Sequence, residues 1–377
     1  MKSIVQYEIE KIIKNKTFIG AVIVSLFVLA GILFIGFYHS QLQGNNQENM
    51  ERYHKNVKEH TGDFTDQKVR AVLGDYMDSF QGINRTSDLF SWEIADTFVP
   101  EDENIHDEMN DAMKQHEKIT IDQIDLKTIK EIGFTSFATP LKFGSYVTWY
   151  DLFKVTGQLF ILTSMIVILI CSLVFSSDTS RNTNQLLLST KFGRNKLTIS
   201  KIIAATLISI VVFLFIQVLS LAAFYIYNNG FTGWDTSIQT NFSLELFNFP
   251  VEINQLQVFF LAIALHFISL LAIVGITTFV SSITNSPFSS LAISLGLFFL
   301  PAALTELIKR GMLYKVLNLF PINNYRVEDF LTLMNSKHDS ILNYFAQNIS
   351  LAIVVLLAIK IVLDCVVYQR MKQYQVS

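Results

Sequence analysis

The sequence of 377 residues contains only two cysteines, and both lie inside long apolar segments. Small exposed domains that depend on disulfides need several cysteines outside such segments. Cys171 and Cys365 are therefore expected to be small buried hydrophobic residues, and a disulfide framework for an exposed domain is excluded.

Charged residues are also scarce, at 16%, whereas hydrophobic residues make up 51% of the chain. A helix of about 20 apolar residues crosses a hydrocarbon core roughly 30 Å thick and satisfies its own backbone amides. The sequence therefore predicts an all-α integral membrane protein with six transmembrane helices. The six segments are Thr17–Tyr38, Lys154–Ser176, Ile202–Tyr227, Leu256–Ser281, Phe288–Thr305 and Ala346–Tyr368.

Two motifs of enzymes are missing. The phosphate-binding pattern GxxxxGK[ST] does not occur, so this chain is not expected to bind a nucleotide. The metalloprotease pattern HExxH does not occur either, because neither HDEMN at 106–110 nor HEKIT at 116–120 fits it. We expect no catalytic residue, no metal site and no cofactor in this chain, which disfavours an intramembrane enzyme.

The distribution of Lys and Arg predicts the orientation. Basic residues are concentrated in the stretch 1–16, in the loop 177–201 and in the tail 369–377, whereas Asn228–Gln255 has none. Both termini are therefore predicted to be cytoplasmic. The segment 306–345 should then be outside although it carries five basic residues, which four acidic residues nearly balance. Because no small-residue cleavage pattern follows the first apolar block, we expect the first span to be retained as an anchor.

The first 16 residues place Ile4, Val5, Ile9, Ile12 and Ile13 on one helical face, with lysines elsewhere. This pattern favours an amphipathic helix in the cytoplasmic headgroup layer. A simple basic flank that fixes orientation explains the lysines equally well, and the two interpretations are compatible.

Residues 39–153 form the one stretch long enough for a water-soluble domain, which we expect to be extracellular and α or α+β. From 39 to 152 there are 21 acidic and 11 basic residues, a net charge of −10. Five histidines lie among these carboxylates, but their spacing matches no ligand signature, so solvated acidic helices are favoured over a metal site. The histidines are His39, His54, His60, His106 and His116.

A second extracellular segment is predicted at 306–345. The apolar run Gly311–Phe320 is too short to cross a bilayer and ends at Pro321. Interfacial or re-entrant helices that enter from the outer face are therefore expected. The predicted organisation is thus 1–16 amphipathic helix, 17–38 first span, 39–153 outer domain, 154–305 spans two to five, 306–345 outer helices, 346–368 sixth span and 369–377 tail.

The cytoplasmic loop before the third span has the most informative pattern. Residues 178–201 read DTSRNTNQLLLSTKFGRNKLTISK. The leucine triplet can offer an apolar face to a partner, Gly193 breaks the helix, and a basic cluster leads back into the membrane. A loop that only sets topology would explain the basic residues, but neither the leucines nor the glycine.

This segment resembles the membrane subunits of ABC transporters of the polysaccharide, drug and peptide exporter class. Such subunits carry an acidic residue after the second span, a short leucine-rich helix with Ser or Thr, a small residue beside a basic one, and a Lys at the third span. The resemblance also covers the amphipathic N-terminus, the six spans and the outer helices. The domain after the first span is larger than in many members and is similar to that of a bacterial subset.

The resemblance implies that the loop docks on a cytoplasmic ABC ATPase subunit, which would bind ATP and Mg²⁺. It further implies a second permease subunit, identical or paralogous, in a bacterial plasma membrane, and no nucleic-acid partner. The residues that would couple this chain to the ATPase are Asp178, Arg181, Leu186, Leu187, Leu188, Gly193, Arg194 and Lys201.

Polar residues within the spans are the candidates for a pathway or a subunit interface. These are Gln158, Gln217 and His266. Polar groups are costly at this depth, although hydrogen bonding between helices is their more frequent role.

The apolar spans favour amphiphilic or hydrophobic cargo, such as a peptide, a drug or a lipid, moved outward. An ion extrusion permease of the same class and a membrane sensor or scaffold that uses the acidic outer domain remain as alternatives.

Overall fold

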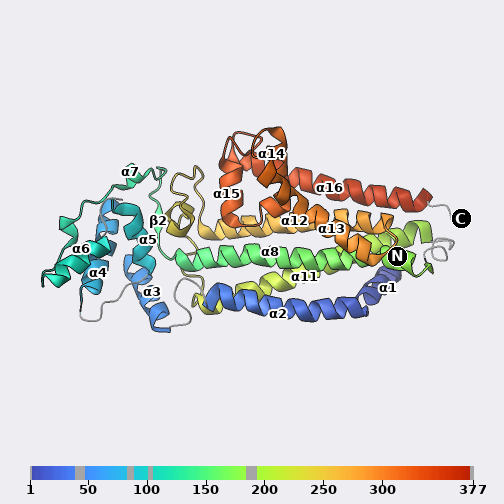
Figure 1. Ribbon diagram of the computed structural model, residues 1–377, viewed down its shortest axis with the longest axis horizontal. Helices are drawn as coiled ribbons and strands as arrows, with labels where there is room; N and C mark the ends of the chain where they lie inside the picture. Colours follow the sequence, from blue (N-terminus) through green and yellow to red (C-terminus); the bar gives the residue numbers. More distant parts are fainter. Residues whose placement is uncertain (1, 39–46, 83–88, 101–104, 184–192, 374–377) are drawn as a thin grey trace. The chain divides into compact units, whose positions relative to one another are not determined.

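The computed structural model describes residues 2–38, 47–82, 89–100, 105–183 and 193–373 (Figure 1). Its helices are α1 (Lys2–Ile13), α2 (Lys16–Tyr38), α3 (Gln47–His60), α4 (Asp66–Phe80), α5 (Leu89–Phe98), α6 (Ile105–Lys114), α7 (Ile129–Ile132), α8 (Val147–Leu173), α9 (Ser176–Ser180), α11 (Thr198–Tyr227), α12 (Gln255–Ile283), α13 (Pro287–Leu307), α14 (Met312–Leu317), α15 (Val327–Asn335) and α16 (Phe345–Gln373). Shorter elements are the 3-10 turns η1 (Ile121–Gln123), η3 (Ile238–Thr240), η4 (Phe242–Leu244) and η5 (Pro321–Asn323), the π-helical turn η2 (Gly193–Leu197), and the strands β1 (Gly62–Asp63) and β2 (Lys142–Phe143).

Six helices in the described residues are long and apolar enough to cross a membrane, which agrees with the predicted number. They are Lys16–Tyr38, Val147–Leu173, Gly193–Tyr227, Gln255–Ile283, Pro287–Leu307 and Phe345–Gln373. The protein is thus a mostly helical, multi-pass membrane protein. Strands are almost absent from the described residues, where β1 and β2 form one short antiparallel pair.

The ends of the spans differ from those predicted. The second span begins at Val147 rather than Lys154, because Trp149, Leu152 and Phe153 continue the helix with buried side chains. It ends at Leu173, three residues before the predicted end. The fifth span begins at Pro287, where the Ser286 hydroxyl accepts the N–H of Ser289 at 3.1 Å. A serine cap followed by proline in the first turn is a strong helix start.

The chain divides into two compact units. The first unit comprises Met1–Ile32, Thr156–Ala222 and Leu261–Ser377, and its long helices lie alongside one another (Figure 1). The second unit comprises Leu33–Val155 and Ala223–Phe260.

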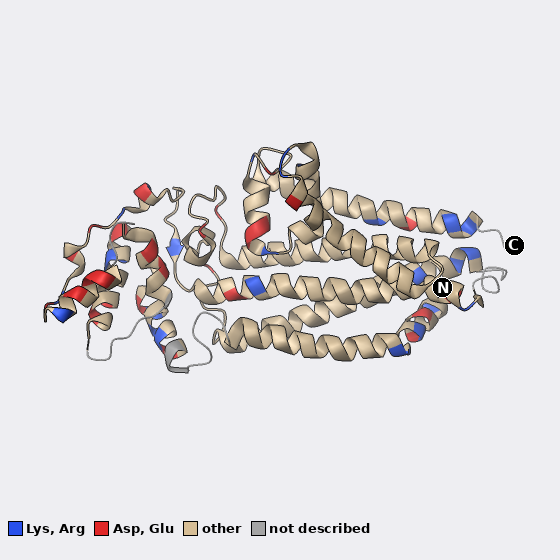
Figure 2. Ribbon diagram, viewed as in Figure 1, with Lys and Arg blue, Asp and Glu red and all other residues tan. Residues whose placement is uncertain are grey.

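In the first unit, charged residues are concentrated near the chain ends and in the segment 306–345 (Figure 2). Figure 2 shows few Lys, Arg, Asp or Glu residues along the helices and several near the marked chain ends. Both α1 and α16 contact η2, so the first helix, the return of the loop before the third span and the last helix lie together.

The second unit has an aromatic core. Phe64 and Phe134 have ring centroids 5.0 Å apart, Phe90 and Phe143 are 5.3 Å apart, and Tyr146 lies 5.3 Å from Phe242. Phe242 belongs to the segment Asn228–Gln255, which lies outside the predicted outer domain 39–153. This segment is part of the core because its backbone also pairs with the rest of the unit, as in the bond from Thr135 N–H to Phe247 C=O (3.0 Å).

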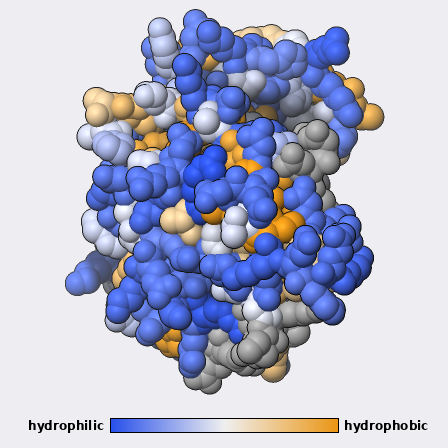
Figure 3. All heavy atoms as spheres, turned by 90° about the vertical axis from the view of Figure 1, so that its left-hand side faces the viewer, coloured by the Kyte–Doolittle hydropathy of each residue, from blue (hydrophilic) through white to orange (hydrophobic). Residues whose placement is uncertain are grey.

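The surface of the second unit is hydrophilic over most of the face in Figure 3. Among the histidines considered for metal binding, His106 lies 3.9 Å from the Trp92 ring and His60 stacks on Phe90. His39 lies outside the described residues. No three His, Cys, Asp or Glu side chains in the described part of the chain are grouped so as to hold a metal ion.

Candidate functional site

A buried cluster of charges lies at the base of the loop before the third span. The Asp178 carboxylate of α9 accepts hydrogen bonds from the ammonium groups of Lys201 on α11 and Lys11 on α1, the latter at 2.5 Å. Lys201 also donates to the carbonyl of Val174 at 3.2 Å, and Lys11 lies 3.8 Å from Glu8. We call Glu8, Lys11, Asp178 and Lys201 the charge cluster.

The charge cluster is shielded from solvent. The side chains of Asp178, Lys201 and Glu8 are each 4% exposed, and that of Lys11 is 28% exposed. Burial favours the neutral form of Asp178, but Lys201 and Lys11 outweigh burial and hold its pKa below the ordinary value. Burial instead raises the pKa of Glu8, with Lys201 and Lys11 opposing the rise. The charge cluster thus contains equal numbers of acidic and basic side chains, which are largely shielded from solvent.

The chain turn that presents Asp178 is held by the end of another span. α8 stops at Leu173, and the Ser281 hydroxyl of α12 accepts the N–H groups of Phe175 and Ser176 at 3.1 Å each. Ser281 in turn donates to the carbonyl of Ser172 at 2.9 Å. The backbone groups released where α8 ends are thereby satisfied, and Asp178 is fixed opposite α11.

The structure therefore brings together two of the predicted coupling residues, Asp178 and Lys201, which are 23 positions apart in the sequence. Their ion pair closes the base of the loop. Gly193 is buried at the start of η2, whereas Arg181 and Arg194 are exposed. Leu186, Leu187 and Leu188 lie outside the described residues.

Two residues of the charge cluster, Glu8 and Lys11, were missed by the sequence analysis. The sequence predicts them only as part of an amphipathic basic helix. The available signal was the acidic Glu8 three positions before Lys11, a spacing at which helical side chains meet. That signal does not indicate the pairing with Asp178, which is 167 positions from Lys11.

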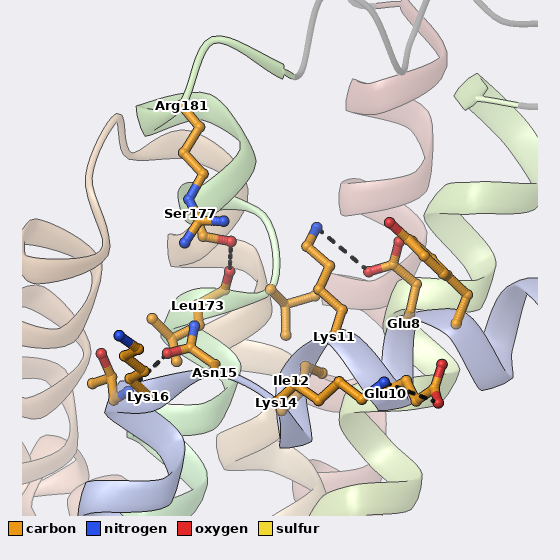
Figure 4. A pocket seen from close by; sticks show the side chains of 13 residues that line it. Glu8, Glu10, Lys11, Ile12, Lys14, Asn15, Lys16, Leu173, Ser177 and Arg181 are labelled. Carbon is orange, nitrogen blue, oxygen red and sulfur yellow. Dashed lines mark hydrogen bonds and ion pairs between the residues drawn. The ribbon is translucent and has the colours of Figure 1, made fainter.

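An open cavity of about 570 Å³ lies beside the charge cluster (Figure 4). Its walls come from the second half of α1, the first turn of α2 and the chain from Leu173 to Arg181. Figure 4 shows the side chain of Arg181 extending toward Ser177, with Lys16 and Asn15 nearby.

The three polar span residues have different surroundings. Gln158 is exposed, whereas Gln217 and His266 are buried. Both amide atoms of Gln217 lack a hydrogen-bond partner within the described ranges. No hydrogen bond or ring contact joins these three residues to one another in the part of the chain that the structure describes, so they do not form a shared site there.

His266 has a structural contact of its own. Its Nε2 lies 3.0 Å from the carbonyl of Tyr325, and its ring stacks on Phe160 with centroids 4.4 Å apart. A Cβ atom added to Gly157 of α8 would lie 2.9 Å from the same Tyr325 carbonyl. Gly157 and His266 each stand about 15 Å along their helices, at 1.5 Å per residue. The chain after η5 thus packs against α8 at Gly157 and against α12 at His266.

The charge cluster has no nucleophile or metal-ligand set, but it can act mechanically. It joins α1, α9 and α11, and η2 contacts α1 and α16. Tyr368 of α16 also donates to the Asn195 side chain of η2 at 3.4 Å. A force on this loop would therefore act on several helices of the first unit together.

The family model described as ABC-2 family transporter protein matches residues 2–373 of the chain. No curated protein and no solved structure matches.

Proposed function

Since this chain belongs to the ABC-2 family of transporter proteins and is a multi-pass permease of an ABC transporter, we propose that the charge cluster couples it to a separate ATPase. Family membership implies association with an ABC ATPase and with a bilayer. The proposed coupling surface is the loop closed by Asp178 and Lys201, with Arg194 and the leucines at 186–188 as contacts.

The observation that carries this proposal is the buried pairing of Asp178 with both Lys201 and Lys11. A loop whose only role was to set the membrane topology would need exposed basic residues but no buried ion pair. Ions are expensive to bury, so such a pair persists where its geometry is supported by several elements. Here the pairing connects the two ends of the loop to α1. A loop held in this way can move as one rigid body when the ATP-driven states of the ATPase differ in their contact energy with it.

We propose further that both termini and this loop face the cytoplasm. The basic residues of α1, η2 and the end of α16 support this orientation under the positive-inside rule. In this orientation the second unit, with its acidic surface, lies outside the cell, and the membrane is the plasma membrane of a bacterium.

The proposed cargo is amphiphilic or hydrophobic and moves outward between two permease subunits. Low burial of three spans supports a second subunit: the apolar windows of α2, α13 and α16 are 11%, 22% and 22% buried, against 78% for α8. Such faces contact either lipid or another subunit. The exposed amide of Gln158 is a candidate for the pathway, and ATP with Mg²⁺ would act in the ATPase.

Purification from the native host tests the proposal. We expect a soluble ATPase to co-purify, and Arg194→Glu to reduce coupled ATP hydrolysis because it reverses a charge at the contact. Arg370→Glu is the matched control, since Arg370 is also exposed and lies at the end of α16, outside the loop. Purification without an ATPase would contradict the proposal, and so would equal losses of hydrolysis in the two variants. Protease cleavage of the loop from outside the cell would refute the orientation.

A further inference from the structure

The cavity beside the charge cluster has the size and lining of a ligand site. Its volume of about 570 Å³ is within the range of roughly 300–1,000 Å³ usual for small-ligand pockets. Apolar side chains of Ile12, Leu173 and Val174 line it together with polar groups. The charged residues in the lining are four basic ones, Lys11, Lys14, Lys16 and Arg181, and two acidic ones, Glu8 and Glu10.

Two of these four cations already have anionic partners. Lys11 pairs with Asp178 at 2.5 Å, and Lys14 pairs with Glu10 at 3.4 Å. Within the described residues, no ion pair is recorded for Lys16 or Arg181, and both are exposed. Two cations are therefore available at the cavity for an anion from outside the chain.

The surface that continues from the cavity is apolar. α2 starts at Lys16, and Ile23, Val24 and Phe27 on this helix are 51%, 62% and 76% exposed. The distance from Lys16 to Phe27 along the helix is about 16 Å at 1.5 Å per residue. This matches about half of a hydrocarbon core roughly 30 Å thick, which is the depth of one leaflet.

We propose that the cavity binds the phosphate of an anionic phospholipid headgroup through Lys16 and Arg181, with the acyl chains along α2. A phosphate could also come from inorganic phosphate, but the adjoining apolar face favours a molecule that has chains. Arg181 is then a lipid contact rather than a contact of the ATPase. The N-terminal end of α2 adds the positive end of a helix dipole to the same site.

The test compares lipid binding to the full-length protein in detergent. Dioleoyl phosphatidylglycerol and dioleoyl phosphatidylcholine are titrated in parallel, and bound lipid is counted by native mass spectrometry. The variant is Lys16→Gln with Arg181→Gln. The control is Arg370→Gln with Lys372→Gln, which removes the same charge from exposed residues at another helix end, outside the cavity.

We expect the wild-type protein and the control to retain phosphatidylglycerol in preference to phosphatidylcholine. A basic residue near an anionic surface contributes about fivefold in affinity, so the test variant should bind phosphatidylglycerol about 25-fold more weakly. Millimolar inorganic phosphate should not displace the lipid.

Three results would overturn the proposal. The first is equal binding of the two lipids by the wild-type protein, a measurement that needs no variant. The second is displacement by inorganic phosphate, which would assign the site to free phosphate. The third is unchanged phosphatidylglycerol binding in the test variant; loss of ATPase co-purification in that variant would then assign the cavity to the partner protein. The lipid measurement uses the permease alone, so its outcome is independent of the coupling proposal.

Discussion

Removing single charges from the buried cluster should have unequal effects on stability. Asp178 bonds both Lys201 and Lys11, whereas Lys201 bonds Asp178 as its one carboxylate within 4 Å in the described residues. Asp178→Asn leaves two lysines with Glu8 as their acidic neighbour. Lys201→Met leaves Asp178 still paired with Lys11.

The magnitudes follow from these remaining pairs. Leaving buried charges without a partner costs about 3–5 kcal/mol of unfolding free energy, which is the loss expected for Asp178→Asn. Lys201→Met removes the charge-assisted bond to Asp178, for about 1.5–3 kcal/mol, together with the bond to the Val174 carbonyl. In the double variant, Asp178→Asn with Lys201→Met, the opposite charges of Lys11 and Glu8 remain together. Replacing a buried ion pair by uncharged groups is often close to neutral for stability. The double variant should therefore lose no more than about 2 kcal/mol.

Unfolding of the full-length protein in mixed micelles, followed as denaturing detergent is added, measures these differences as a double-mutant cycle. Lys55 and Glu59, 4.0 Å apart and exposed on α3, provide a control cycle. A pair four positions apart on one helix should show coupling of only about 0.5 kcal/mol. If the loss in the double variant of the cluster equals the sum of the two single losses, Asp178 and Lys201 do not act as a pair.

Two further predictions concern other parts of the chain. Gly157→Ala should destabilise the protein by about 1–3 kcal/mol, because the new Cβ would lie 2.9 Å from the Tyr325 carbonyl. The control is Gly296→Ala, where a Cβ would meet nothing within 4 Å, so this variant should be neutral or slightly stabilising in the same unfolding assay. Equal effects of the two substitutions would refute the tight contact at Gly157. Burial, with Asp96 and Glu245 adding to it, raises the pKa of Glu93 to about 7 from 4.5. The folded state then holds a proton that the unfolded state releases, so the unfolding free energy should fall as pH rises from about 4.5 to 7, by at most about 3.4 kcal/mol. Glu93→Gln should abolish this fall in thermal unfolding measured at pH 5 and pH 8, and a fall that persists in the variant would exclude Glu93 as its cause.

The number of spans could be predicted from the sequence because a long apolar segment in a bilayer must satisfy its backbone hydrogen bonds internally, which an α-helix does. Their exact ends could not. Val147–Phe153 contains Thr148 and Asp151, and its helix is stabilised by packing of Trp149 and by the bond from Tyr227 to Asp151 (2.9 Å). Such contacts are made between distant segments, and hydropathy along the chain does not report them.

The candidate site was predicted in part. The pattern of residues 178–201 indicated that Asp178 and Lys201 belong to one functional segment, and the structure pairs them. The same pattern suggested a contact surface, yet both residues are buried and cannot touch another protein. Glu8 and Lys11 of α1 add one acidic and one basic side chain to the same cluster. Which distant residues pair depends on their proximity in the folded chain, which a linear motif does not encode.

Burial of the cluster changes how coupling through this segment should be understood. A residue that contacts an ATPase must be accessible, so accessible groups such as Arg194 can transmit a force only through residues behind them. Lys201 lies near the start of α11, a helix of 30 residues that continues without a break to Tyr227. At 1.5 Å per residue it is about 45 Å long. In the coupling that we propose, a displacement at the cluster would be carried along α11 as a rigid helix and to α1 through Lys11. If the cluster were instead a flexible hinge, its charges would have to separate during each cycle, and separating buried ions costs several kcal/mol. The lower-energy route keeps the four charges together and lets α1, α9 and the start of α11 move as one body.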